Sequence, residues 1–193
     1  MPPNTRITKE QIVNAAIRLL REKGIEAVTA RKVAEESGCS SQPVFSHFPS
    51  IQRLREEAFQ SICHGWMQDF KTWKDRPDYV AAIVLWVVDL ARTWPCLYQT
   101  LFFSREYGSG YLLQLLKKAG IILDLLQYAQ FYYQLERETC RDILMRAFFL
   151  LQGITDSIAV GGNLHFTDQQ ILSIMQRSVE DMVRGSQKRS TTR

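Results

Sequence analysis

The sequence predicts an all-α fold of two domains, and three features lead to this expectation. Apolar residues recur at intervals of three and four along most of the 193 residues, which places them on one face of a helix. No stretch alternates apolar and polar residues as a half-buried strand does. Glycine and proline stand between the periodic segments, where they separate helices. We expect domains at residues 1–52 and 53–186, followed by a disordered basic tail at 187–193.

The first predicted helix begins after Thr8, whose side chain can cap it, and ends near Lys23. Gly24 follows its last turn, a common place for glycine. The apolar stripe of this helix consists of Ile12, Ala15, Ala16, Leu19 and Leu20. One face of the helix is therefore expected to lie against a core.

Residues 29–48 predict two short helices joined by a tight turn. Thr29 can cap the first of them, and Val33 and Ala34 supply its apolar side. Gly38 ends that helix, because glycine enters the left-handed conformation at low cost. The chain is therefore expected to turn sharply before the second helix begins.

The second short helix is expected to expose an unusual set of side chains. Ser40 can cap it, and Pro43 is tolerated within its first turn. Val44 and Phe48 are four residues apart and would hold it to the core. The side chains that remain to point outward are those of Ser41, Gln42, Phe45, Ser46 and His47. Small polar groups with an aromatic ring and a histidine suit the major groove of DNA, which admits one helix.

This stretch resembles the helix-turn-helix of the TetR family of bacterial transcriptional regulators. The matching positions are Thr29, Val33, Ala34, Ser37, Gly38, Cys39, Ser40, Phe45, His47, Phe48 and Leu54. The apolar stripe of the first helix agrees as well, so the resemblance extends over residues 7–59. It implies a three-helix DNA-binding domain joined by a long helix to a helical ligand-binding and dimerisation bundle. Regulators of this kind are usually repressors released from DNA by a small-molecule effector.

Three residues depart from the pattern of the family. Phe45 stands where Tyr is usual, and Ile51 stands where Lys is usual, so one hydroxyl and one cation that could contact phosphates are missing. Pro43 stands where Thr is common and removes one backbone donor. We expect these changes to alter the affinity for DNA and the choice of bases, and to leave the fold unchanged.

From the resemblance we expect DNA contacts from Thr29, Arg31, Ser40, Ser41, Gln42, Val44, Phe45, Ser46 and His47. Gln42 and Ser41 are the candidates for base contacts, because glutamine can pair bidentately with adenine. Thr29, Phe45 and His47 would instead position the DNA backbone. Residues 1–7 are expected to form a solvated tail, with an arm that reaches phosphates or the minor groove as the alternative.

A long helix from Ser50 to about Trp73 is expected next, and its length makes it the link between the two domains. Further helices are expected at 79–94, from Pro95, at 112–135 with a possible break at Gly120, at 136–160, and at 168–184 after a cap at Thr167. Gly108, Ser109 and Gly110 are expected to form a flexible connector, and the tail from Gly185 is expected to be disordered.

The second domain is rich in aromatic side chains, which at helical spacing usually belong to a core. Asp89 interrupts the apolar helix at 79–94. A surface position or an arginine partner would explain a carboxylate there, and the alternative is a polar anchor in a ligand pocket. As a set the aromatic residues could line an apolar pocket between helices. We name as ligand-binding candidates Trp66, Trp86, Asp89, Phe102, Phe103, Phe131 and Phe149, and expect an apolar or aromatic effector.

The last two predicted helices carry more apolar surface than one core can cover. Two such helices from each protomer could form a four-helix interface in a homodimer. The dimerisation candidates are Leu144, Phe148, Leu151, Ile158, Ile171, Met175 and Val179. A two-fold dimer would place its recognition helices about 34–36 Å apart, so the operator should be roughly palindromic.

Composition and motifs limit the other classes of function. The net charge of +4 is too small to indicate nucleic-acid binding by itself. Cys39, Cys63, Cys96 and Cys140 are widely spaced, which favours free thiols in a reducing cytoplasm, with a redox-sensing cysteine as the alternative. No motif for catalysis, metal or cofactor binding occurs, and no apolar run is long enough to span a bilayer. A ligand-independent DNA-binding dimer and an enzyme built on a helical bundle remain as alternative functions.

Overall fold

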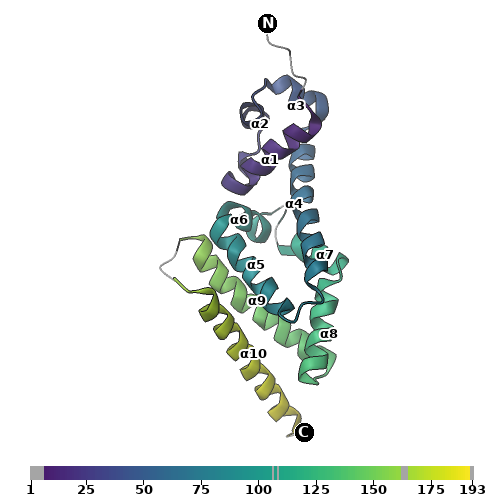
Figure 1. The fold of residues 1–193 in the computed structure, drawn as a ribbon, viewed down its shortest axis with the longest axis vertical. Helices are drawn as coiled ribbons and strands as arrows, with labels where there is room; N and C mark the ends of the chain where they lie inside the picture. Colours follow the sequence, from purple (N-terminus) through teal and green to yellow (C-terminus); the bar gives the residue numbers. More distant parts are fainter. Residues whose placement is uncertain (1–6, 106, 108, 162–164, 192–193) are drawn as a thin grey trace. The chain divides into compact units, whose positions relative to one another are not determined.

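The structure is a computed structural model that describes residues 7–105, 107, 109–161 and 165–191. Every regular element in these residues is helical, and none is a strand (Figure 1). The elements are α1 (Lys9–Lys23), the 3₁₀ turn η1 (Ile25–Ala27), α2 (Ala30–Glu36), α3 (Ser41–His47), α4 (Ile51–Trp73), α5 (Tyr79–Thr93), α6 (Pro95–Phe103), α7 (Ser109–Lys118), α8 (Ile121–Tyr133), α9 (Arg137–Ala159) and α10 (Asp168–Thr191). The expected all-α fold class is confirmed.

The chain forms two compact units, which are not divided at residue 52. Unit 1 consists of residues 1–69 and 94–112, and unit 2 consists of residues 70–93 and 113–193. Most of α4 and all of α6 therefore belong with the N-terminal helices. The sequence alone did not indicate this grouping, because α6 reaches unit 1 only after an intervening helix of unit 2.

Unit 1 is built around α1, which starts with a capping box. The Thr8 hydroxyl accepts from the backbone N–H of Gln11, and the Gln11 side chain accepts from the N–H of Thr8. All five residues of the predicted apolar stripe are buried. Helix α6 packs on α1, where a Cβ added at Gly24 would lie 3.7 Å from the Cβ of Cys96. The φ of Gly24 is +79°, a value that favours glycine, so the chain can turn close to α6.

Unit 2 is organised around α9, which packs against α5, α8 and α10. The side of α9 that faces these helices is buried at Cys140, Ile143, Leu151 and Ile154. The predicted break in the preceding helical segment is confirmed, because Gly120 has a φ of +80° between α7 and α8. The predicted connector is wrong at Ser109 and Gly110, which form the first turn of α7, while Gly108 lies outside the described residues.

Helix α10 starts as predicted and ends later than predicted. The Thr167 hydroxyl accepts from the N–H of Gln170, and the Gln170 side chain accepts from the N–H of Thr167. The helix continues through Gly185 to Thr191, so the disordered tail expected from residue 185 is wrong for residues 185–191. Glycine costs a helix about 1 kcal/mol relative to alanine. The helix continues nevertheless, and the buried Ser186 beside Gly185 donates its hydroxyl proton to the Met182 carbonyl.

Within the part of the chain that is described, no single helix is both long and apolar enough to cross a membrane. Helices α5 and α6 reach the required length and composition only when they are taken together, across the break at Trp94.

Candidate DNA-binding surface

Helix α2 and the turn after it have the predicted geometry. The Thr29 side chain accepts from the backbone N–H of Lys32 at 3.3 Å, so Thr29 caps α2 as expected. The hydroxyl proton of Thr29 is not used in this contact. Gly38 has a φ of +67°, which confirms a left-handed turn before α3.

Helix α3 is anchored on one side and exposed on the other. Val44 is 1% exposed and Phe48 is 2% exposed, so both side chains lie in the core of unit 1. The expectation that Val44 contacts DNA is corrected, because its side chain offers no surface. Ser40 is the N-cap residue of α3, but its side chain makes no capping hydrogen bond. The exposed side chains of α3 are those of Gln42, Phe45, Ser46 and His47, and Ser41 is half-buried.

Two polar side chains on α3 already make contacts within the protein. The Ser46 hydroxyl donates to the Gln42 carbonyl at 3.0 Å, so its only proton is in use. The Nε2 of His47 lies 3.1 Å from the Ile7 carbonyl, and since a carbonyl only accepts, Nε2 must carry a proton there. His47 thus fixes the start of α1 beside α3, a role that sequence reasoning did not suggest. Gln42 is the exposed side chain of α3 whose hydrogen-bonding groups have no partner among the described residues.

The cations of unit 1 divide into paired and unpaired groups. Lys9 pairs with Glu57, and Arg18 pairs with Glu36, each at 2.7 Å. Arg31 and Lys32 on α2 are exposed and have no ion-pair partner among the residues that the structure describes. Sequence reasoning named Arg31 and missed Lys32, although both lie within three residues of the Thr29 cap. These two cations are available to phosphates at the start of α2.

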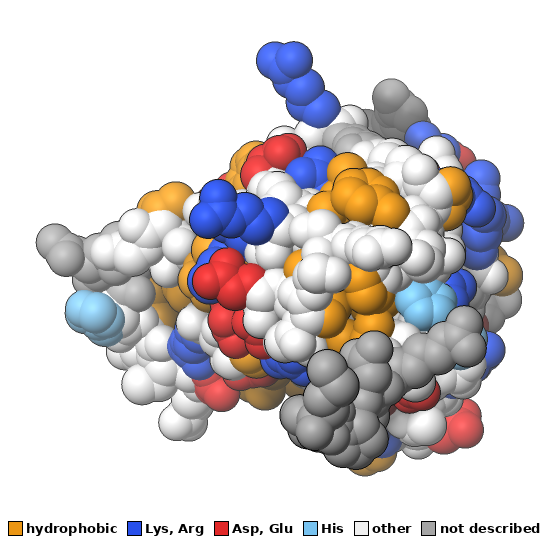
Figure 2. Space-filling view, turned by 90° about the horizontal axis from the view of Figure 1, so that it is seen from above, with side chains coloured by type: hydrophobic (Ala, Val, Ile, Leu, Met, Phe, Trp, Pro, Cys, Tyr) orange, Lys and Arg blue, Asp and Glu red, His pale blue; other side chains and the backbone are white. Residues whose placement is uncertain are grey.

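Figure 2 looks onto the end of the molecule at which α2 and α3 lie in Figure 1. Hydrophobic side chains reach the surface there among uncharged groups, and Lys and Arg side chains, Asp and Glu side chains and a histidine lie around them. The face therefore combines apolar, neutral polar, basic and acidic groups. This combination suits the base edges and phosphates of a major groove.

The residues predicted to bind a ligand are divided between the two units. Trp66, Phe102 and Phe103 belong to unit 1, and the others belong to unit 2. Phe102 is buried, Trp66 and Trp86 are half-buried, and the remaining four are exposed: Asp89, Phe103, Phe131 and Phe149. Phe131 at 81% exposed and Phe149 at 62% exposed lie on the surface of unit 2.

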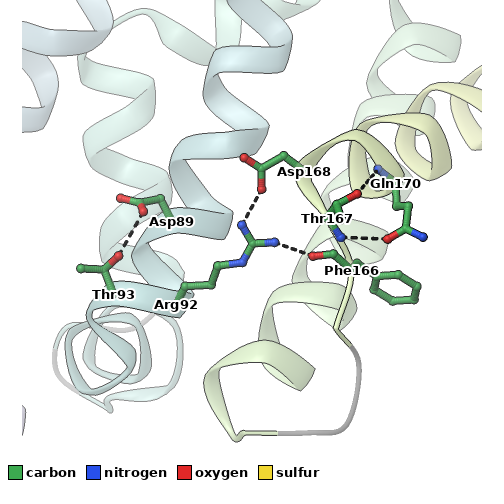
Figure 3. A network of polar contacts seen from close by, with 7 residues as sticks. All are labelled: Asp89, Arg92, Thr93, Phe166, Thr167, Asp168 and Gln170. Carbon is green, nitrogen blue, oxygen red and sulfur yellow. Dashed lines mark hydrogen bonds and ion pairs between the residues drawn. The ribbon is translucent and has the colours of Figure 1, made fainter.

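Asp89 lies at the surface, which is one of the explanations that the sequence offered for a carboxylate on this apolar helix. Its carboxylate accepts from the Thr93 hydroxyl at 3.0 Å (Figure 3). The neighbouring Arg92 pairs with Asp168 and donates to the Phe166 carbonyl at 2.7 Å. These contacts tie the end of α5 to the start of α10. They give this polar cluster a structural role in unit 2.

A different polar group is buried in unit 2. The Tyr79 side chain is 5% exposed, and its hydroxyl has no hydrogen-bond partner among the described residues. Burial and the nearby Asp124 carboxylate raise the pKa of Tyr79 to about 12. Asp124 itself pairs with Lys74 at 2.8 Å. Sequence reasoning missed Tyr79, because it stands at the start of an apolar run and looks like an ordinary core residue.

The dimerisation candidates also separate by burial. Leu151, Ile171 and Met175 are buried within the protomer, so they hold α9 and α10 in unit 2. Leu144, Phe148, Ile158 and Val179 are half-buried. The large apolar side chains that α9 exposes are instead Met145 and Phe149, four residues apart on one side of the helix.

The cysteines are free thiols in two environments. Cys63 and Cys140 are buried, whereas Cys39 and Cys96 are half-buried. Burial raises the pKa of Cys63 to about 12 and also raises the pKa of Cys140. Across the described residues, no three His, Cys, Asp or Glu side chains are grouped so that they could hold a metal ion.

A helical unit with an anchored, outward-facing helix after a left-handed turn defines a helix-turn-helix protein of the DNA-binding class. Residues 12–58 match the family described as bacterial regulatory proteins, tetR family. The match spans the N-terminal helix-turn-helix and supports a TetR family regulator, as the sequence resemblance implied. None of the curated proteins matches the chain.

Proposed function

We propose that this DNA-binding regulator is a repressor that binds a roughly palindromic operator as a homodimer and is released by a small, largely apolar effector. The observation that carries the DNA-reading part is the exposed side of α3. There Gln42 faces outward while Val44 and Phe48 fix the helix from beneath. A rigid helix with an uncommitted amide is suited to bidentate pairing with an adenine.

The groups around Gln42 support this arrangement. Thr29 retains a proton that it can donate to a phosphate, and Arg31 and Lys32 follow it on the exposed side of α2. Phosphate contacts of this kind fix the register of a protein on DNA without reading its sequence. The bases would then be recognised by α3, mainly through Gln42 and with Ser41 beside it.

Dimerisation is proposed through the exposed side of α9. Met145 and Phe149 are large apolar side chains at the surface of unit 2, with the half-buried Phe148 in edge contact with Phe149 at 5.7 Å between ring centroids. Burying such side chains against a second copy gains about 1.5–3 kcal/mol for each one. This surface replaces the buried candidates Leu151, Ile171 and Met175, and keeps the half-buried Leu144, Phe148, Ile158 and Val179 at its edges.

The effector is proposed to bind in unit 2 beside Phe70 and Trp86, whose ring centroids lie 4.9 Å apart. Tyr79 stands seven residues before Trp86, on the same side of α5, and offers a buried hydroxyl. The proposed effector is an aromatic molecule with one hydrogen-bond acceptor, which would pair with the Tyr79 hydroxyl. It would act by binding one conformation of the protein better than the other, with α4 as the shared element. The alternative, a DNA-binding dimer without effector, predicts that no aromatic compound raises the melting temperature of the protein.

In vitro selection of duplex DNA tests the reading of bases by Gln42. Wild type should enrich a palindromic sequence with an adenine at the same place in each half-site. The variant Gln42→Ala should lose about 1–3 kcal/mol of discrimination at that base pair and retain the rest of the consensus. Gln60→Ala, which changes an exposed glutamine of α4 in the same unit, is the matched control. An identical consensus from Gln42→Ala and wild type would refute the assignment.

A further inference from the structure

Phe45 is an aromatic side chain displayed to solvent on the reading helix. It is 56% exposed, and among the described residues of unit 1 only Phe103 is a comparably exposed large apolar side chain. The two phenylalanines lie on different helices, α3 and α6. Exposed apolar side chains occur on any protein surface, so exposure alone gives Phe45 no role.

The position of Phe45 on α3 gives its exposure a meaning. Phe45 follows Gln42 by three residues and Ser41 by four, so the three side chains are neighbours on the helix surface. Val44 on the adjacent position is buried and fixes the orientation of the helix. When Gln42 faces the edge of one base, we therefore expect Phe45 to lie against the DNA next to it.

The chemistry of the ring limits what Phe45 can contact. A phenyl ring has no group that can donate to a phosphate or pair with a base edge. The neighbouring Ser46 already donates its proton to the Gln42 carbonyl, so this part of α3 is poor in donors. In the major groove, the C5 methyl group of thymine is the apolar feature that a hydrophobic side chain can recognise.

We infer that Phe45 is a specificity-determining residue that recognises the methyl group of a thymine adjacent to the base pair read by Gln42. The inference rests on the proposed entry of α3 into the major groove. It assigns to Phe45 a base contact, in place of the backbone-positioning role expected from the sequence. It also accounts for an apolar ring in a surface that must otherwise bind polar base edges.

The test replaces single thymines by deoxyuridine, which removes only the methyl group. The probe is the duplex enriched by wild type in the selection, and the binding of each substituted duplex is measured by fluorescence anisotropy. We expect one thymine in each half-site at which the replacement weakens wild-type binding by about fourfold, the effect of losing one methyl contact with apolar surface. Replacement at the other thymines should have little effect.

Two variants identify the side chain responsible. Phe45→Ala should bind the parent duplex more weakly than wild type and should not distinguish thymine from uracil at the sensitive position. Phe103→Ala, which removes an equally exposed ring from α6, should keep the full uracil penalty. Thermal melting of both variants checks that each is folded.

The inference is overturned if wild type tolerates uracil at every position. It is also overturned if Phe45→Ala retains the same penalty as wild type, because the ring would then lie against the sugar-phosphate backbone or off the DNA. If wild type enriches no sequence at all, the proposed operator-reading function fails, and the inference fails with it. If wild type enriches a consensus but binds the uracil-substituted duplexes as tightly as the parent duplex, the inference fails and the proposed function stands.

Discussion

Unit 1 and unit 2 place their large apolar side chains differently. In unit 1 the described residues expose only two of them, Phe45 and Phe103, and the core beneath is closed by fully buried residues such as Phe59 and Tyr98. Unit 2 exposes many more: Val80, Leu113, Leu123, Tyr128, Phe131, Tyr132, Met145, Phe149 and Val160. Where such side chains gather in one patch, they commonly mark a binding interface.

The two units therefore differ in how completely they bury their large hydrophobic side chains. Unit 1 buries its apolar residues internally and leaves an aromatic ring at the surface that we assign to DNA. Unit 2 has surplus apolar surface on α8 and α9, which suits association with a second copy.

The largest expected effect is the difference in the free energy of unfolding between removing a buried ring and removing an exposed ring of unit 1. Phe59 is fully buried and lies 4.5 Å from the Tyr107 ring, measured between centroids. Phe59→Ala should lower the free energy of unfolding by about 3–5 kcal/mol, because it leaves a cavity. Phe45→Ala should change it by less than about 0.5 kcal/mol, since no buried contact is lost. Urea denaturation measures both, and equal losses would show that Phe45 is part of the core.

Dimerisation through the exposed apolar surface of unit 2 should be disrupted by a charged side chain. Phe149→Glu should give a monomer, because a carboxylate would be buried without a partner in the proposed interface. Its affinity for the palindromic duplex should fall by about 100-fold or more, since the second half-site is no longer bound by a linked protomer. Sedimentation velocity and anisotropy measure the two effects. Val80→Glu is the matched control, and a dimeric Phe149→Glu protein would contradict the proposed interface.

The buried hydroxyl of Tyr79 should make unit 2 sensitive to alkaline pH. The pKa of Tyr79 is raised to about 12 in the folded protein, whereas an unfolded tyrosine titrates near pH 10. The unfolded state therefore loses this proton first, and stability falls as the pH rises from about 10 toward 12. The loss from this group should reach about 1 kcal/mol at pH 11.

Tyr79→Phe removes this titration and leaves the ring in place. The variant should be at least as stable as wild type at pH 7, because the hydroxyl has no partner to lose. Its stability should fall less steeply between pH 9 and pH 11 in chemical denaturation. Parallel curves for the two proteins would show that the Tyr79 hydroxyl is solvated or paired in solution.

The features that the sequence predicted correctly depend on local chemistry. Thr8, Thr29 and Thr167 cap their helices through contacts three residues away, and Gly38 and Gly120 adopt the positive φ that their places in the pattern required. Such signals lie within one turn of the chain. They are visible without knowledge of the tertiary structure, which is why the helix-turn-helix was predicted nearly to the residue.

The features that the sequence missed depend on contacts between distant segments. Nothing near α6 indicates that it packs on α1. The periodicity of α9 marks several apolar faces, but only the positions of α5, α8 and α10 decide that Leu151 is covered and that Phe149 is not. Val44 was assigned both to the core and to the DNA contacts, and its burial decides between them.

The central claim is that α3 reads DNA as part of a dimer, and footprinting of the purified protein on genomic DNA at physiological salt tests it most directly. The account predicts two protected segments related by two-fold symmetry, with centres about 34–36 Å apart along the duplex, bound by two protomers. A single protected segment bound by one protomer, or no protected segment from a folded dimer, would contradict it.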